Sequence, residues 1–442
     1  MKILYILPYI PYPLNSGGNQ SVFNMIEAAR KVHDISLLMS VNNQSDADAL
    51  EQLQELWSDI TFYPFRPNSH PVDLMGYTEQ SRIGTFKFKL CEKIHNSMTR
   101  KMRRQRLAHT REEMLQVNAD LAMGKPTNFI RLNSTLNCQP LIAQPEFGDF
   151  VYEVSRKGFD VIQVEFYEFM PLVYFLPENV KKIFVQQEIR YVRNRNEMTL
   201  FDKVTPLDRF RYDMLKDIEM SALARYDKII SLTEIDREKM LAENPNLDIY
   251  VSPAVVNIKQ GKQREVVEAS ELVFVGGSDH FPNADAMVWF CHEVIPELRK
   301  LGNIPKINIV GVWRSEIKEM LSKLAPEIHF AGFVEDLAEF INGKVSIIPI
   351  RIGSGMRMKI IESIFAASPI VTTSKGCEGL PTKHGENCLI ADTAVDFAKE
   401  VRRMLDDTAL QKQLADNAKA MTESLLNKEA LCAKRLAVYD TL

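Results

Sequence analysis

Residues 344–363 read KVSIIPIRIGSGMRMKIIES, and this stretch decides the fold. Its first part, 344–349, is an apolar run typical of a strand buried on both faces. Its last part, together with the following residues to 365, has the apolar spacing of a helix. A strand, a glycine-containing loop and a helix in this order form half of a βαβ unit, which indicates a parallel sheet.

Similar apolar runs recur along the whole chain of 442 residues and alternate with helical stretches. The expected strands are 2–7, 34–39, 59–63, 160–165, 181–186, 228–232 and 248–251 in the first half, and 271–275, 306–310, 327–330, 344–349, 369–373 and 388–391 in the second. The expected fold class is therefore α/β, with two Rossmann-like, doubly wound parallel-sheet domains.

A polar stretch at 254–270 separates the two series of strands and is expected to be a linker. We expect a first domain over 1–255, with a basic helical insertion at about 75–135. The second domain is expected over 268–420. The chain is expected to close with one long helical segment from about 394 to 439. A C-terminal helix at 421–442 is expected to cross back.

The composition sets limits on location and partners. The net charge of −4 gives no reason to expect nucleic acid as a partner. Six cysteines lie far apart without metal-ligand spacing, which indicates reduced thiols. The first residues contain three prolines and no small-residue cleavage site, which argues against a signal peptide. No apolar run reaches the roughly 18 residues of a membrane span. We expect a cytoplasmic protein.

The segment 82–111 differs from the rest because it holds ten Lys or Arg residues and one acidic residue. It therefore carries a formal charge of +9, and the remaining chain carries −13. Two interpretations stand. The segment is a solvated helical insertion, or it binds an anionic partner such as a lipid surface, a pyrophosphate carrier or a polyanionic glycan.

The loop after the 344–349 strand is expected at the carboxyl end of its sheet, where open α/β sheets bind ligands. Gly353–Gly355 would present bare N–H groups near a helix start, which stabilises anions. Arg357 and Lys359 would add full charges that suit phosphate. Glu362, one turn into the helix, could accept hydrogen bonds from vicinal hydroxyls such as those of a ribose.

Residues 351–380, RIGSGMRMKIIESIFAASPIVTTSKGCEGL, resemble the C-terminal signature of retaining GT-B glycosyltransferases, specifically glycosyltransferase family 4. Three further segments resemble the same family: FVGGSDHFPNADAMVWF at 274–290, AGFVEDLAEFI at 331–341 and PYPLNSGGNQSVFNMIEAA at 11–29. The resemblance implies two domains that face each other across a cleft. It also implies transfer of a sugar from a nucleoside diphosphate sugar, with retention at the anomeric carbon.

Carried over by position, the resemblance implies roles for single residues. Arg357 and Lys359 would bind the diphosphate, and Glu362 the ribose. The remaining donor-side residues implied are Gly17, Gly18, Arg351, Gly353, Ser354, Gly355 and Glu378, with Gly332, Phe333 and Val334 along the base. No metal is expected, because cations already face the leaving group.

The sequence departs from the family pattern at two positions. Ser354 stands where many members carry a glutamate, and Gln187 stands where related sequences often carry a histidine. Glutamine can hydrogen-bond a sugar but cannot exchange a proton near neutral pH. The first-domain site candidates are Gln187, Glu188 and Arg190. The loop at Asp279, His280 and Asn283 follows an expected strand and is a further candidate.

The function expected is therefore a retaining glycosyltransferase with a glycan or lipid-linked acceptor, acting in cell-surface polysaccharide synthesis. Peripheral contact with an anionic membrane through 82–111 is a further expectation. Two alternatives stay open: a catalytically impaired GT-B scaffold, to which the two departures point, and a sugar-nucleotide epimerase.

Overall fold

The computed structural model describes residues 1–14, 17–66, 127–137, 145–255, 265–425 and 427–442. By its internal contacts the chain divides into two units. One comprises Met1–Pro67 with Asn133–Leu442, and the other comprises Asn68–Leu132. Within the second unit the described residues, 127–132, belong to helix α4 (Thr127–Asn133). The elements discussed below belong to the first unit.

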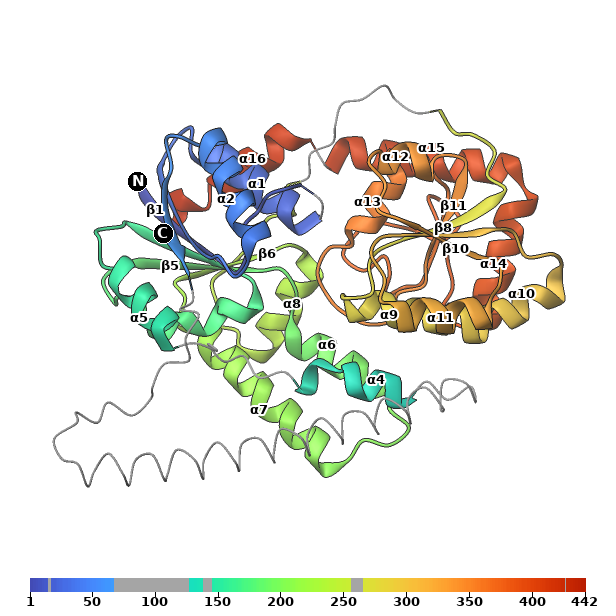
Figure 1. Ribbon diagram of the computed structural model, residues 1–442, viewed down its shortest axis with the longest axis horizontal. Helices are drawn as coiled ribbons and strands as arrows, with labels where there is room; N and C mark the ends of the chain where they lie inside the picture. The colour runs from blue at the N-terminus through green and yellow to red at the C-terminus, as the bar shows by residue number, and fades with distance from the viewer. Residues whose placement is uncertain (15–16, 67–126, 138–144, 256–264, 426) are drawn as a thin grey trace. The chain divides into compact units, whose positions relative to one another are not determined.

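The first unit contains two parallel sheets (Figure 1). The seven-stranded sheet has the order β3-β2-β1-β4-β5-β6-β7, and the six-stranded sheet has the order β10-β9-β8-β11-β12-β13. The strands of the first sheet are β1 (Lys2–Leu7), β2 (Asp34–Ser40), β3 (Thr61–Phe65), β4 (Val161–Glu165), β5 (Lys181–Gln186), β6 (Lys228–Ser231) and β7 (Ile249–Val251). Those of the second are β8 (Glu271–Val275), β9 (Ile307–Val310), β10 (Ile328–Gly332), β11 (Lys344–Ile348), β12 (Ile370–Thr372) and β13 (Leu389–Ile390). The expected fold class is confirmed.

Helices cover both faces of each sheet (Figure 1). Those joined to the first sheet are α1 (Gly17–Ala29), α2 (Gln44–Leu56), α5 (Pro145–Val154), α6 (Arg190–Thr199), α7 (Pro206–Leu223) and α8 (Glu234–Glu243), with the 3-10 turns η1 (Thr135–Asn137) and η2 (Tyr167–Tyr174). Those joined to the second are α9 (Phe281–Trp289), the π-helical turn η3 (Phe290–Val294), α10 (Ile295–Leu301), α11 (Ser315–Leu324), α12 (Leu337–Ile341), α13 (Met358–Phe365), α14 (Ala394–Asp406) and α15 (Thr408–Leu425). The described chain ends with α16 (Lys428–Leu436) and η4 (Tyr439–Thr441).

Alternating side chains of β1 supply the core on both faces of the first sheet. Ile3, Tyr5 and Leu7 belong to a buried cluster that includes side chains of α1 and α2. Leu4 and Ile6 belong to a second buried cluster, which includes side chains of α5 and α7. Because successive strand residues point to opposite faces, one continuous apolar run contributes to both layers.

Each sheet has a point next to its first strand where the strand order reverses. β1 lies between β2 and β4, and β8 lies between β9 and β11. Loops at the carboxyl ends of strands on either side of such a point leave a crevice in which α/β proteins bind ligands. In the second sheet these are the loops 276–280 and 349–357. The glycine-containing loop is therefore at the place where the topology favours a ligand.

The C-terminal residues pack against the first domain. Arg435 Nε of α16 donates to Ser252 Oγ at 2.8 Å, and the hydroxyl of Tyr439 donates to Gln163 Oε1 at 2.7 Å. The expected continuous helix from 394 to 439 is wrong, because three helices occupy this stretch. Asp407 accepts from the backbone N–H of Leu410, and Asn427 caps α16. Short polar side chains of this kind favour helix starts over helix interiors.

All thirteen expected strands are present, with ends that agree within two residues. The largest shift is at β3, expected at 59–63 and found at Thr61–Phe65. Asp59 instead forms an ion pair with Arg30 at 2.7 Å. Pro64 fits inside β3 because this strand lies at the edge of the sheet, where one N–H can be missing.

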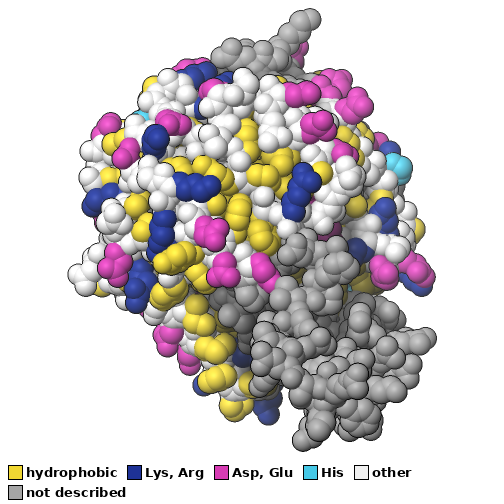
Figure 2. All heavy atoms as spheres, turned by 60° about the vertical axis from the view of Figure 1, so that its left-hand side comes forward, with side chains coloured by type: hydrophobic (Ala, Val, Ile, Leu, Met, Phe, Trp, Pro, Cys, Tyr) yellow, Lys and Arg dark blue, Asp and Glu magenta, His cyan; other side chains and the backbone are white. Residues whose placement is uncertain are grey.

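Three observations bear on the surroundings of the protein. On the face in Figure 2, basic and acidic side chains are interspersed among hydrophobic ones. Among the described helices, none is long and apolar enough to cross a bilayer. The cysteines of the described chain are free thiols, namely Cys291, Cys377, Cys388 and Cys432. The basic segment 82–111 lies outside the described residues, so its expected contact with a membrane stays a prediction.

Candidate functional site

The loop between β11 and α13 requires glycine at two positions. Gly353 has φ +120° and Gly355 has φ +78°, values that other residues adopt only with strain. A Cβ added to Gly355 would also overlap the carbonyl oxygen of Gln187, in the first domain. The two glycines thus allow the loop to approach the first domain closely.

The polar groups of this loop bind the first domain. The N–H of Ile189 donates to Ser354 Oγ at 2.6 Å. The N–H of Gly353 donates to Asn196 Oδ1 at 3.3 Å, and that of Gly355 donates to an oxygen of Asp236 at 2.9 Å. The expectation of bare N–H groups at Gly353 and Gly355 is therefore wrong, because side chains from the first domain already accept from them.

Arg357 directly precedes α13 and provides no side-chain cap to it. Its Nη1 donates to the carbonyl of Ser354 at 2.6 Å, while its Nη2 is buried without a hydrogen-bond partner. Burial lowers the pKa of the guanidinium, and Glu188, Glu378 and Asp236 partly offset this effect. A buried cationic donor without a partner is costly, so this nitrogen is suited to binding an anionic ligand.

Lys359 and Glu362 lie on the first turns of α13. The ammonium of Lys359 has no ion pair or hydrogen bond with the described residues and lies 5.7 Å from the centre of the Phe274 ring. Burial lowers the pKa of Lys359 to about 8, against the opposing effect of Glu362. Burial raises the pKa of Glu362, against the effect of Lys359. Neither Lys359 nor Glu362 has a side-chain hydrogen bond or ion pair with the described residues, so both polar ends are left for a ligand.

The N-terminus of α1 lies against the N-terminus of α13. A Cβ added to Gly17 would lie 2.6 Å from Cγ of Met358. Gly17 and Gly18 are the first residues of α1, and Met358 is the first residue of α13. Each helix N-terminus carries unpaired N–H donors and the positive end of a dipole. Two such ends side by side favour a ligand with negative charge.

The loop after β8 faces the same place. A Cβ added to Gly276 would lie 3.0 Å from Nζ of Lys359 and 2.6 Å from Nδ2 of Asn283. Asn283 donates to the carbonyl of Gly277 at 2.8 Å, and its Oδ1 is buried without a partner. The expected site residue Asp279 instead pairs with Arg314 at the surface. The pKa of His280 is lowered to about 4 by loss of hydration and by the cations Arg193, Lys359 and Arg357.

Two expected donor-binding residues are engaged in ion pairs. Arg351 donates to the buried carboxylate of Asp285 through Nη2 (2.8 Å) and Nε (3.2 Å), and it lies over the Trp289 ring. Glu378 pairs with Lys375 and with Lys239 of the first domain. Burial alone would raise the pKa of Glu378, but the two lysines lower it. In this structure Arg351 therefore ties the loop after β11 to α9, and Glu378 ties its own loop to α8.

The residues expected along the base lie where β10 ends. Gly332 has φ +71° and accepts from the N–H of Gly311 at 2.7 Å. Phe333 is 68% exposed, and Val312, in the loop after the neighbouring strand β9, is 71% exposed. Val334 packs against a small buried cluster. Two exposed apolar side chains in neighbouring loops are suited to a flat ring.

In the first domain, Gln187 follows β5 and joins a buried polar network. Its Nε2 donates to Glu165 Oε2 at 3.0 Å, and Gln163 donates to Glu165 Oε1 at 2.7 Å. Burial raises the pKa of Glu165 to about 6, while Arg435 and the two glutamines act against this. Tyr439 binds the same Gln163, so the network connects the C-terminus with Gln187.

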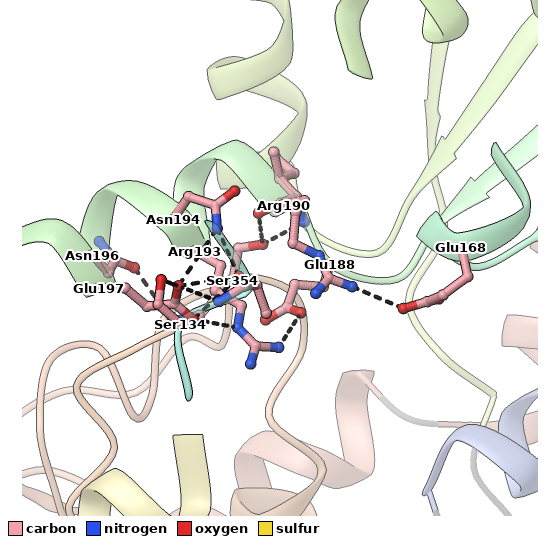
Figure 3. Close-up of polar contacts among 12 residues, drawn as sticks. Ser134, Glu168, Glu188, Arg190, Arg193, Asn194, Asn196, Glu197 and Ser354 are labelled. Atoms are coloured by element: carbon pink, nitrogen blue, oxygen red, sulfur yellow. Dashed lines mark hydrogen bonds and ion pairs between the residues drawn. The ribbon is translucent and has the colours of Figure 1, made fainter. Parts of the chain in front are cut away.

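Glu188 is held by a chain of ion pairs (Figure 3). Arg193 donates to Glu188 Oε2 and to Glu197 Oε1, each at 3.0 Å. Glu197 is fully buried and also accepts from Ser134 Oγ at 2.7 Å and from the N–H of Thr135 at 2.9 Å. Burial would raise the pKa of Glu188, but Arg193, Arg190 and His280 outweigh it and lower this pKa to about 2.

Arg190 begins α6 and turns toward η2 rather than toward Arg357. Its Nη2 pairs with Glu168 at 2.9 Å, and its guanidinium lies 4.5 Å from the centre of the Tyr167 ring. The backbone N–H groups of Arg190 and Tyr191 donate to the buried Glu219 of α7 at 3.0 and 2.9 Å. Glu219 thus caps the N-terminus of α6 from another helix.

Several residues at the site were missed from the sequence. Asp236 follows Thr233 at the spacing of a helix cap, and its N–H does donate to Oγ1 of Thr233 at 3.1 Å. Its additional contact with Gly355 depends on the tertiary fold. Arg193 and Glu197 have the spacing of an ordinary helical ion pair, so their spacing gave no signal. Glu165 is the last residue of the buried strand β4. A carboxylate at the end of an apolar run was the sequence signal that could have indicated a site residue.

The arrangement suits an anionic, polyhydroxylated ligand. Two helix N-termini, Arg357 Nη2 and Lys359 supply positive charge. Glu362 and Glu188 supply carboxylates that can accept from hydroxyls. Among the described residues, no group of three or more His, Cys, Asp or Glu side chains could hold a metal ion. The expectation that no metal takes part stays a prediction.

Comparisons with known proteins agree with this geometry. Residues 269–407 match the family model of Glycosyl transferases group 1. A protein of Klebsiella pneumoniae, named as an uncharacterized 44.6 kDa protein in the cps region, is 23% identical over 435 residues. The alignment covers 94% of each of the two chains.

Solved structures share the fold over the whole chain. TarM of S. aureus, in complex with fondaparinux, alpha-GlcNAc-glycerol and UDP, is 10% identical with a TM-score of 0.63, covering 99% of both chains. Sucrose-phosphate synthase from Thermosynechococcus elongatus is 15% identical with a TM-score of 0.62, covering 100% of this chain and 98% of the other. HepE of Anabaena, in complex with UDP and glucose, is 11% identical with a TM-score of 0.60, covering 100% of both. The match over 269–407 and the GT-B fold together support a glycosyltransferase.

Proposed function

We propose that the protein is a retaining glycosyltransferase that moves a sugar from a nucleoside diphosphate sugar to a glycan or lipid-linked acceptor. The observation that carries this proposal is the meeting of α1 and α13 at Gly17 and Met358. Beside it lie Nη2 of Arg357 and Nζ of Lys359, neither of which has a hydrogen-bond partner among the described residues. A diphosphate is an anion of matching charge.

In this proposal Arg357 and Lys359 bind the diphosphate, and Glu362 accepts from the ribose hydroxyls. Phe333 and Val334, with Gly332, line the base. Buried cations and helix termini stabilise the charge that develops as the bond between the anomeric carbon and the phosphate oxygen breaks. Gly17, Gly18 and the loop Gly353–Gly355 shape the space around the phosphates.

The reaction takes place on one face of the donor sugar. The acceptor hydroxyl oxygen forms a bond to the anomeric carbon as the phosphate oxygen leaves. The departing phosphate takes the proton of that hydroxyl, so no side chain has to act as nucleophile. Retention of configuration follows because the new bond forms on the face from which the old one departs. Closure of the two domains would exclude water from this step.

A role in cell-surface polysaccharide synthesis is supported by the Klebsiella relative, whose name places it in a cps region. UDP is the first nucleotide to test, because TarM and HepE were solved with UDP. Contact of 82–111 with an anionic membrane belongs to the same proposal. Binding of the protein to liposomes that does not depend on their anionic lipid content would count against that contact.

The donor is tested by a thermal-shift screen of UDP, GDP, ADP and their common sugar conjugates. A ligand at one hundred times its dissociation constant stabilises by about 2.7 kcal/mol, which is readily measured. We expect a shift with one nucleotide family. No shift with any of them would contradict the proposal and favour a scaffold that has lost its activity.

The reaction is tested with the donor that binds and a set of glycan and glycolipid acceptors. The anomeric configuration of the product, read by NMR, should equal that of the donor. Inversion would contradict the retaining mechanism. Isomerisation of the donor without an acceptor would instead favour an epimerase.

A further inference from the structure

Gly353 leaves a small gap between two charged side chains from different domains. A Cβ at Gly353 would lie 2.9 Å from Nη2 of Arg357 and 3.2 Å from Oε1 of Glu188. Glycine at this position therefore keeps open a space that is lined by a guanidinium nitrogen on one side and a carboxylate oxygen on the other.

Neither of these two atoms is used inside the described protein. Nη2 of Arg357 is buried without a partner. Glu188 receives its side-chain hydrogen bond from Arg193 at Oε2, so Oε1 is left without one. The hydroxyl of Ser354, the nearest alternative in the loop, already accepts from Ile189 at 2.6 Å. Glu188 thus offers the acceptor oxygen at this gap.

The carboxylate of Glu188 is fixed before any ligand binds. Arg193 forms an ion pair with this carboxylate and another with the buried Glu197 (Figure 3). Glu197 is in turn held by hydrogen bonds from Ser134 and Thr135. Arg193 and its neighbours keep Glu188 ionised at neutral pH, because its pKa is about 2. An ionised, positioned carboxylate accepts strong hydrogen bonds from hydroxyl groups.

We propose that Oε1 of Glu188 accepts hydrogen bonds from hydroxyls of the donor sugar, which makes Glu188 a specificity-determining residue. The assignment rests on the proposed function. A carboxylate repels the diphosphate, so this oxygen must face a neutral part of the donor that carries O–H groups. The gap at Gly353 then receives the bond between the diphosphate and the sugar of the donor. The phosphate lies toward Arg357 and the sugar toward Glu188.

The test compares a nucleotide with its own sugar conjugate. Calorimetry measures the dissociation constants of UDP and UDP-glucose, or of GDP and GDP-mannose, whichever pair the wild type binds. In E188Q the conjugate should bind at least tenfold more weakly than to the wild type. The nucleotide alone should bind equally well or more tightly, because a negative charge near Arg357 is gone. A residue with only a structural role would weaken both ligands together.

Glu243→Gln is the matched control, since Glu243 also forms an ion pair in the first domain, with Lys216 at 2.6 Å. It should bind both ligands as the wild type does. Should E188Q fail to fold in a thermal melt, E188D replaces it, because a shorter side chain withdraws the carboxylate from the gap. E188D should show the same selective loss of the conjugate.

Equal losses for both ligands, or no loss for either, would overturn the assignment of Glu188 and leave the proposed function intact. A wild type that binds neither nucleotide nor conjugate would overturn the proposed function and this assignment together.

Discussion

Lys359 provides a pH-dependent reporter of the proposed phosphate site. Its pKa of about 8 is low for a lysine, because burial disfavours the ammonium. A diphosphate binds the protonated form better, so affinity for the nucleotide should be constant from pH 7 to about 8 and fall above it. The phosphates themselves are ionised throughout this range. Calorimetry from pH 7 to 9.5 measures the profile.

The control for this profile is K359R, because a guanidinium stays protonated over the whole range. Its affinity should not fall above pH 8. A decline of the same size in K359R would show that another group titrates, and it would contradict the role given to Lys359.

At the residue scale, the sequence predicted the charged groups but not all of their partners. Arg357, Lys359 and Glu362 were predicted together, and the structure brings them to one helix start. Arg351 was expected at the donor and is instead paired with Asp285, 66 residues away in sequence. Sequence spacing reports neighbours within one element. It carries no information on which distant side chain neutralises a given charge.

The loop that precedes α13 depends on glycine for two separate reasons. An alanine at 355 would have a strained φ of +78° and would also overlap the carbonyl of Gln187. Gly385 has a similar φ, +75°, with no atom within 4 Å of an added Cβ. G385A should therefore cost about 1–2 kcal/mol of unfolding free energy from backbone strain alone. G355A should cost more and should also weaken nucleotide binding.

Urea unfolding of both variants, with calorimetry of the nucleotide, checks this prediction. Equal destabilisation by G355A and G385A would mean that the contact with Gln187 does not matter, and the close approach of loop and first domain would be wrong.

The N-terminus of α6 is stabilised by Glu219 of α7. This carboxylate accepts from two backbone N–H groups of α6 and from Gln186 Nε2, at 2.8–3.0 Å. E219A leaves these donors buried and unpaired, so it should lower the unfolding free energy by about 1–3 kcal/mol. D217A, at an exposed position of the same helix, should stay within about 0.5 kcal/mol of the wild type. Urea unfolding measures both, and a silent E219A would contradict the capping role.

At the element scale, apolar runs predicted the strands well because each strand is buried on both faces. Helix ends in the C-terminal region were not predicted, since Asp407 and Asn427 resemble ordinary polar residues of an amphipathic helix. Their capping hydrogen bonds identify them as helix starts only in the folded structure.

At the scale of the whole molecule, the C-terminal residues tie the end of the chain to the core of the first domain. The hydroxyl of Tyr439 binds Gln163 at 2.7 Å and shares a hydrogen bond with Tyr5 at 2.6 Å, both in a buried setting. Y439F should therefore lower the unfolding free energy by about 1–3 kcal/mol, because two buried partners lose a bond.

Tyr250 offers the comparison, since its hydroxyl donates to the carbonyl of Lys434 at 2.7 Å in an exposed setting. Y250F should change the unfolding free energy by about 0.5 kcal/mol or less. If thermal and urea unfolding give equal effects for the two variants, the buried network does not stabilise the docked C-terminus.

The contact between the two domains explains why the sequence could predict the fold but only part of the site. Within each domain, order and periodicity determine which strands form. The hydrogen bonds of Ser354 with Ile189 and of Gly355 with Asp236 span 165 and 119 positions of sequence. Such pairs depend on how two separately formed domains meet, and the sequence pattern within either domain does not encode that.

The central claim is that a nucleoside diphosphate binds at the start of α13. The direct measurement is calorimetry of the responding nucleotide with the wild type, K359A and K323A. Lys323 is an exposed lysine of the second domain, paired with Glu319 at 2.7 Å. We predict that K359A weakens binding at least tenfold while K323A binds as the wild type does. Equal affinity of K359A and the wild type would place the nucleotide elsewhere and contradict the site.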